Sequence, residues 1–483
     1  MHGKAFNIIF YIIILCIISY SYNYIILPFK TTNIPFKDKE NTTIINNFLS
    51  QIDTNQLFTT LSFGNPAKNV DFYFTMEQLA FAVLSNHCLK GSYSTYNPTL
   101  SNTFKNQTPY DKTFGYISKA CLATEKCTFY NDLKLSKKIS FEEFKFLFGN
   151  DTLPKTENSD SERLCGNIGL LRYTSNEYLT VNNFIYYLKE SNLTNSKKWG
   201  LFYFDKESSY NVDKEIQAKY DGLFIAGITN NSYLEIFKTE NIFPQYGFGS
   251  FFWSLTFNKI YYKDKDYEYL CDNNTQVEFI IDFNYISCTR HYYDSIKQYF
   301  FKKYLDEKIC TEEIVKTTYE DDNHLIVCSP EIKKYLNLFP NIYFFTENYQ
   351  YIINLDYNDV FVEYNNKIYF LIMFKEALNT LWRVGKILLK KYPLIFDYEQ
   401  KTISFVHLKK FGKLPNDDTK EKQNQKNNNI FLNYKLYIIL VLLIFAVVLG
   451  IFIGKALWQK KRKIRANELD DNCEYIEKFD IDK

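Results

Sequence analysis

Short apolar or alternating stretches recur along residues 57–408, separated by turns rich in Asn, Asp, Gly and Lys. Among these stretches are LFTTLSF, VDFYF, QVEFIID, HLIVC, YQYIINL, VFVEY, KIYFLIMF and TISFVHL. Alternation with a period of two is typical of half-buried β-strands, so the pattern predicts a large, mostly β protein. The better helix candidates are 293–305 and the neighbours of Leu388.

Two longer apolar runs lie outside this β region. The first, 6–18, follows a basic residue and has the length of a signal-peptide core, so we expect cleavage near Ser21 or Tyr22. The second, 436–454, carries no charge and is long enough to cross a bilayer, which makes a buried core helix the weaker interpretation. Basic residues at 455–465 follow it and predict a cytosolic C-terminus.

The expected organisation is that of a single-pass type I membrane protein. Its ectodomain would be luminal or extracellular, in the secretory pathway, a lysosome-like compartment or at the cell surface. The polar stretch before the second apolar run lacks the apolar surface needed to fold and predicts a flexible stalk. The predicted segments are a signal peptide at 1–22, a leader or propeptide-like segment at 23–56, an N-terminal β lobe at 57–240, a C-terminal β lobe at 241–412, the stalk at 413–433, the transmembrane helix at 434–454 and a cytosolic tail at 455–483.

The charge, the cysteine content and the absence of known motifs limit the partners and cofactors that the sequence predicts. A net charge of +2 with interspersed signs gives no reason to expect a nucleic-acid partner. Of the 10 cysteines, Cys16 and Cys473 lie in the predicted signal peptide and tail, and the even remainder can pair in an oxidising compartment. No cysteine or histidine shows zinc-ligand spacing, and no HExxH, Gly-x-Ser-x-Gly or phosphate-binding loop occurs, so no metal or cofactor is expected.

Six sequons agree with a secretory route. Each is an Asn-x-Ser/Thr without proline at the middle position, and in so Asn-rich a chain several arise by chance. They begin at Asn41, Asn106, Asn150, Asn192, Asn230 and Asn273.

Four motifs occur in an order that carries more information than any one of them. They are LFTTLSFGNPAKNVDFYFTMEQLAFAV at 57–83, CGNIGL at 165–170 with GLFIAGI at 222–228, QVEFIIDFNYISC at 276–288, and WRVGKILLKKYPLIFDYEQKTISFVHL at 382–408. Together they resemble the eukaryotic pepsin-like aspartic protease family, of the cathepsin D and pepsin type. The resemblance implies a mostly β, bilobal acid-protease fold and a disulfide between Cys310 and Cys328 in the C-terminal lobe.

The resemblance also locates the two loops that carry the catalytic aspartates in that family, each of which reads Asp-Thr/Ser-Gly. Thr75 stands where the first aspartate belongs, and Glu77 stands in place of the loop glycine. Asp282 stands at the second aspartate and is followed by Phe283 and Asn284. Both loops therefore depart from the family pattern.

These departures bear on mechanism, because aspartic proteolysis needs two adjacent carboxylates that share one proton. The hydroxyl of Thr75 cannot complete such a pair, and Glu77 or Asp71 could replace it only with a shift of strand register. The family's Gly-Asp pair near the C-terminus has become Gly385-Lys386. We therefore expect an inactive or impaired aspartic endopeptidase homologue, a pseudoenzyme that binds peptide or protein in the cleft between its lobes.

Two alternatives stay open at this stage. The chain could be an active aspartic endopeptidase with a divergent catalytic loop, in which case Asp282 would be essential for proteolysis. It could also be a structural surface or adhesion glycoprotein that has only inherited the fold.

Overall fold

The fold is described from a computed structural model of the 483-residue chain. Statements about structure refer to the residues whose placement is described, namely 24–33, 48, 55–76, 80–84, 96–110, 117–152, 166–172, 183–204, 212–229, 242–246, 252–263, 268–316, 322–345, 351–376 and 381–406. All of these residues fall within one unit, Met1–Leu408.

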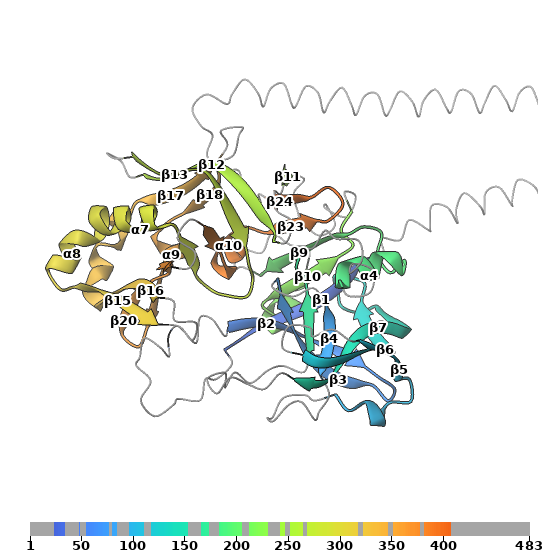
Figure 1. The fold of residues 1–483 in the computed structure, drawn as a ribbon. Coiled ribbons are helices and arrows are strands. Elements are labelled where there is room, and N and C mark those ends of the chain that lie inside the picture. Colours follow the sequence, from blue (N-terminus) through green and yellow to red (C-terminus); the bar gives the residue numbers. More distant parts are fainter. Residues whose placement is uncertain are drawn as a thin grey trace, which may run out of the picture. The chain divides into compact units, whose positions relative to one another are not determined.

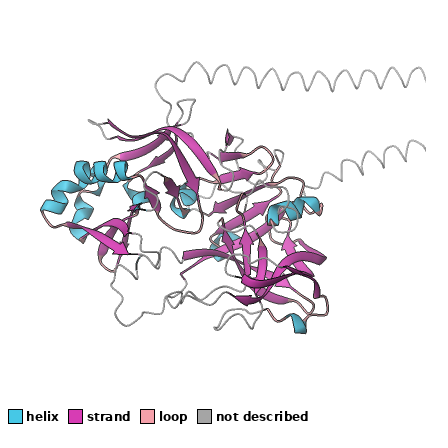
Figure 2. Cartoon of the chain, in the orientation of Figure 1, coloured by secondary structure: helices cyan, strands magenta, loops and turns pink. Residues whose placement is uncertain are grey.

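Two large β-sheets form most of this part of the chain, as Figure 2 shows in magenta. In spatial order the first sheet consists of β11 (Ile242–Tyr246), β24 (Thr402–Val406), β23 (Leu394–Asp397), β9 (Lys198–Tyr203), β10 (Gly222–Ala226), β1 (Ile25–Asn33), β2 (Asn55–Phe63), β3 (Lys68–Thr75), β8 (Gly166–Gly169), β4 (Phe81–Leu84), β7 (Lys138–Thr152), β6 (Ile117–Tyr130) and β5 (Lys105–Tyr110). This sheet takes strands from both sides of residue 240, because β11, β23 and β24 continue it beyond β9.

The second sheet is built from the later part of the chain. In spatial order it consists of β18 (Tyr351–Leu355), β17 (Asn341–Phe345), β12 (Ser254–Lys263), β13 (Glu268–Phe279), β22 (Trp382–Val384), β14 (Ile286–Cys288), β21 (Ile372–Lys375), β16 (Asp322–Cys328), β20 (Lys367–Phe370) and β19 (Phe361–Tyr364), with β15 (Cys310–Lys316) pairing to β16. The prediction of a mostly β fold is therefore confirmed.

Among the residues that the structure describes, helices are short, and the longest helical stretch covers the predicted 293–305. The α-helices are α4 (Phe184–Glu190), α5 (Lys214–Lys219), α7 (Arg290–Ile296), α8 (Lys302–Asp306), α9 (Tyr357–Val360) and α10 (Lys386–Lys391). A π-helical segment, Lys297–Phe301, joins α7 to α8, and 3-10 turns occupy Pro98–Leu100, Pro330–Lys334 and Leu336–Leu338. Both helix predictions are confirmed by α7–α8 and α10 (Figure 1).

The two sheets contain the same arrangement of six strands. In the first, the order β2-β3-β8-β4-β7-β6 combines parallel β3–β8 and β4–β7 pairs with antiparallel neighbours. In the second, β12-β13-β22-β14-β21-β16 repeats every one of these directions. In each, the last strand in sequence, β8 or β22, inserts between two earlier ones. The repeat is consistent with a bilobal β protein.

The predicted leader segment 23–56 contributes to this structure. Strand β1 lies between β10 and β2 in the first sheet, with Ile25, Ile26 and Phe29 fully buried. Phe48 is 3% exposed and stacks on Tyr369 of the second sheet, with ring centroids 3.7 Å apart. Most of the described side chains of this segment are thus buried as core residues are, which is unusual for a removable leader.

The membrane topology falls outside the described residues. In the part of the chain that the structure describes, no helix is long and apolar enough to cross a bilayer. The predicted signal peptide at 1–22, stalk at 413–433, span at 434–454 and tail at 455–483 all lie beyond that part, and they stay predictions.

Candidate functional site

The first candidate loop begins where β3 ends. Thr75 is 2% exposed and lies opposite Gly169 in the parallel β3–β8 pair. Its carbonyl accepts a hydrogen bond from the Leu170 amide at 2.8 Å, which closes the end of the strand. The next side chain, Met76, is 2% exposed and belongs to the main hydrophobic core.

The second candidate loop begins where β13 ends, at Phe279. The Ile280 amide donates to the Val384 carbonyl at 3.0 Å, and Gly385 lies directly against the loop backbone. A Cβ atom at Gly385 would come within 2.4 Å of the Phe283 carbonyl and 2.6 Å of the Tyr285 carbonyl. Only glycine permits this approach, which gives a physical reason for the Gly385 of the terminal motif.

The strand registers allow the two loops to be superimposed residue by residue. In the first sheet Ile168 lies opposite both Phe74 and Phe81. In the second sheet Val384 lies opposite both Phe279 and Ile286. Phe74 therefore corresponds to Phe279. It follows that Thr75 corresponds to Ile280.

A pair of backbone hydrogen bonds supports the same alignment. The Gly169 amide donates to Ala80 at 2.9 Å, and the Gly385 amide donates to Tyr285 at 3.1 Å. Ala80 stands as far after Thr75 as Tyr285 stands after Ile280. Neither strand end therefore delivers a carboxylate: one carries a hydroxyl and the other an aliphatic side chain.

Asp282 lies two positions beyond the strand end and bonds across to the first loop. Its Oδ2 accepts a hydrogen bond from the Met76 amide at 2.8 Å, a contact between residues more than two hundred positions apart in sequence. In the register alignment Asp282 corresponds to Glu77, which lies outside the described residues. The structure thus brings Asp282 close to the first loop through a backbone amide.

Lys386 occupies the position where the resembled family has an aspartate, and it is fully buried. Its Nζ donates to the Ile281 carbonyl at 3.0 Å, and its backbone amide donates to the Phe283 carbonyl at 2.9 Å. The side chain and the backbone amide of Lys386 therefore bond to the residues on either side of Asp282. Sequence reasoning identified the substitution at Lys386 but not this contact, because nothing in the local sequence shows that the ammonium is buried.

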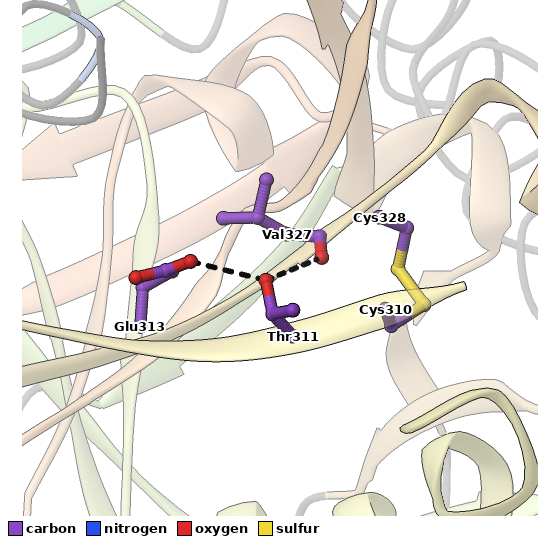
Figure 3. Close-up of a disulfide and its surroundings, with 5 residues drawn as sticks. All are labelled: Cys310, Thr311, Glu313, Val327 and Cys328. Carbon is purple, nitrogen blue, oxygen red and sulfur yellow. Dashed lines mark hydrogen bonds between the residues drawn. A yellow bond between two sulfur atoms is a disulfide. The ribbon is translucent and has the colours of Figure 1, made fainter. Parts of the chain in front are cut away.

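The disulfide implied by the family resemblance is present. Cys310 and Cys328 lie opposite each other in the β15–β16 pair and are bonded (Figure 3). Beside them the Thr311 hydroxyl contacts Glu313 at 3.1 Å and the Val327 carbonyl at 3.4 Å. The bridge closes one end of this pair.

Four other cysteines are unpaired and buried. They are Cys121, Cys127, Cys271 and Cys288. Burial raises the pKa of each thiol, which makes all four poor nucleophiles at neutral pH. Cys88 and Cys165 lie outside the described residues.

The sequons differ in how much of them the structure describes. Asn106 in β5, Asn192 in the turn after α4 and Asn273 in β13 are exposed. Asn150 lies in β7, with a side chain outside the described part, and Asn41 and Asn230 lie outside it altogether. The exposed acceptors are open to modification, and glycosylation stays a prediction.

Within the described ranges, no three His, Cys, Asp or Glu side chains gather in a way that could hold a metal ion. No family model matches the chain, and none of the curated proteins compared with it is significantly similar. The resemblance to pepsin-like proteases therefore depends on the four sequence motifs.

Proposed function

We propose that this protein is a non-catalytic relative of the pepsin-like aspartic proteases, anchored in a membrane, that binds a peptide or protein without cleaving it. The observation that carries the proposal is the strand register, which aligns Thr75 with Ile280 at the two strand ends. The paired carboxylates of aspartic proteolysis would have to stand at equivalent positions of the two loops, and these positions are neutral.

The contacts of Asp282 support the same interpretation. One carboxylate oxygen is engaged by the Met76 amide, a charge-assisted hydrogen bond that suits a structural tie between the loops. The ammonium of the buried Lys386 donates a hydrogen bond to the carbonyl of Ile281, the residue before Asp282, and so helps to fix the loop backbone. A water-activating base would instead need a second carboxylate with which to share a proton.

The experiment is a proteolysis assay with the purified full-length protein and a denatured polypeptide substrate, between about pH 3 and pH 7. We expect no cleavage above the background of a mock preparation. Asp282→Asn should behave identically. Acid-range cleavage that Asp282→Asn abolishes would instead establish the alternative of an active endopeptidase with a divergent loop.

A second variant separates the two possible alignments. If the sequence motif aligns the loops correctly, Thr75 corresponds to Asp282, and Thr75→Asp restores a pair of catalytic carboxylates. If the strand register is correct, Thr75 corresponds to Ile280, and the variant does not restore the pair. We expect Thr75→Asp to remain inactive, with folding checked by circular dichroism. Gain of acid protease activity in this single variant would contradict the register alignment.

Binding is tested separately, by panning a random peptide library on the full-length protein in detergent micelles. Recovery of a consensus sequence favours a peptide-binding role. Failure to enrich any sequence favours the remaining alternative, a structural surface or adhesion glycoprotein.

A further inference from the structure

Arg172 is a buried arginine that has no acidic partner among the residues that the structure describes. It lies three residues after the end of β8 and is 4% exposed. Its Nη1 atom is buried and has no hydrogen-bond partner, and none of the ion pairs within the described residues includes it. Arginine remains protonated in proteins, so this site carries a full positive charge.

The surroundings of Arg172 are aromatic. Its guanidinium lies over the Trp253 ring, 5.6 Å from the centroid. The groups that act on it electrostatically are the phenols of Tyr398 and Tyr186, which are neutral at pH 7. Burial lowers the pKa of the Arg172 guanidinium, which expresses the penalty for keeping the charge in this place.

The aromatic side chains are fixed by other contacts. The Trp253 Nε1 donates to the Leu170 carbonyl at 3.0 Å. The Tyr398 hydroxyl bonds to the Leu170 and Leu171 carbonyls at 3.1 and 3.2 Å, and Asn183 donates to the same hydroxyl at 3.1 Å. These groups are preorganised around the guanidinium, and none of them neutralises it.

A second cation acts on the same tyrosine, Tyr186, as Arg172 does. Lys197 lies over the Tyr186 ring at 4.3 Å, but it is paired with Glu190 at 3.0 Å. The carboxylates of Glu190 and Glu399 also act electrostatically on Tyr186, and neither is paired with Arg172. Within the described residues, the charge of Arg172 is therefore not neutralised by an ion pair. A buried charge without a counter-ion is strongly unfavourable, so a single anionic group is the chemistry that fits.

We propose that Arg172 is the anchor of a binding site for a carboxylate-bearing ligand, with Trp253 stacked on one face of the guanidinium. The planar fork of arginine matches the two oxygens of a carboxylate, and one cation matches one negative charge. The site is independent of whether the loops at Thr75 and Asp282 have any catalytic role.

The test is thermal unfolding of the full-length protein in detergent micelles, with sodium acetate as the probe and sodium chloride at equal ionic strength as reference. We expect acetate to raise Tm in a saturable way and to change the fluorescence of the buried Trp253. Arg172→Met should weaken the apparent acetate affinity by about tenfold or more, because it removes the guanidinium that would bind the carboxylate.

Arg290→Met is the matched control. Arg290 also lies over an aromatic ring, that of Phe374 at 5.0 Å, but it is paired with Asp294 at 2.9 Å. Its replacement should leave the acetate response unchanged. If Arg172→Met does not fold, Arg172→Lys replaces it, and that variant should retain a weaker response.

Three outcomes overturn the proposal. The first is a wild-type protein on which acetate acts no differently from chloride, a result that needs no variant. The second is an acetate response of equal size in Arg172→Met. The third is a saturable response to inorganic phosphate but not to acetate, lost in Arg172→Met, which would assign the site to phosphate instead of carboxylate.

Discussion

The loops that follow β3 and β13 occupy equivalent places in two sheets of the same design, yet they are held in different ways. After β3, the Leu170 amide bonds to the Thr75 carbonyl at the strand end. After β13, the equivalent amide, that of Lys386, bonds to Phe283, three residues further into the loop. The order and directions of the strands are thus repeated, whereas the loop after β13 is hydrogen-bonded differently from the loop after β3. We call the loop after β13 the rebuilt loop.

The rebuilt loop also has its own hydrophobic cluster. Its members come from the loop, from β16, from β20, β21 and the residue between them, from α10 and from the N-terminal segment: Phe48, Ile280, Phe283, Tyr285, Leu325, Val327, Tyr369, Leu371, Met373 and Ile387. Met76 of the first loop lies in the main core instead. Residues that have become part of a local core are fixed by packing, which suits a structural role better than a catalytic one.

The largest expected effect comes from removing the N-terminal contribution to this cluster. Phe48→Ala deletes a buried ring that stacks on Tyr369, and it should lower the free energy of unfolding by about 3 to 5 kcal/mol. Chemical denaturation of the purified protein measures this. As a control, Leu100→Ala removes a side chain that is 57% exposed, and it should change stability by less than about 0.5 kcal/mol. An equally small effect of Phe48→Ala would show that the segment does not pack on the second sheet.

A second prediction tests the close approach of the rebuilt loop. Gly385→Ala places a Cβ atom 2.4 Å from a backbone oxygen, so the loop must shift, at a cost of about 2 to 3 kcal/mol. Thermal unfolding should show a lower Tm. Lys333→Ala, at an exposed ion pair with Glu363, should leave Tm almost unchanged. A neutral Gly385→Ala would mean that the loop does not lie on this glycine.

A third prediction concerns the bond between the loops. Asp282→Ala removes the acceptor for the Met76 amide and should cost about 1 to 3 kcal/mol, whereas Asp282→Asn retains an amide oxygen and should cost less. Denaturant titration of both variants measures the difference. Equal stability of the wild type and Asp282→Ala would argue against a structural tie.

The smallest effect is expected in the first sheet, at the turn between β6 and β7. Burial opposes ionisation of Asp132, but hydrogen bonds from Ser136 and Lys137 outweigh it and lower the pKa of this carboxyl. A lowered pKa contributes stability above the unfolded value of about 4, and this contribution is lost as pH falls through the folded value. Asp132→Asn should therefore show a smaller loss of stability between pH 7 and pH 3 than the wild type. An unchanged acid profile would contradict this.

The sequence predicted the strands, the helical segments and the Cys310–Cys328 pair because each depends on local pattern or on a recognisable motif. It could not predict the register of the second loop. The apolar run continues past Phe279 through Ile280 and Ile281, so nothing local marks the end of β13. That end is set by pairing with β22, more than a hundred residues later. Because the motif contains an aspartate at 282, the sequence alignment matched Thr75 with Asp282, two positions beyond Ile280.

The role of residues 23–56 was also hidden for a physical reason. The apolar residues of β1 come soon after the apolar run of the predicted signal peptide, and strand and leader residues look alike there. Burial of Phe48 depends on Tyr369, far along the chain. The Arg172 site was missed too, since a single arginine has no sequence signal of burial.

The position of β1 has a consequence for the order in which the molecule can be assembled. Its partner β10 lies about two hundred residues downstream, which at roughly 5 to 20 residues per second means a delay on the order of ten to forty seconds during synthesis. Until then β1 lacks its β10 neighbour, and β9 waits about as long for β23, which lies a similar distance downstream. Such unpaired edges are templates for aggregation, so the nascent first sheet is the part that most needs protection by chaperones.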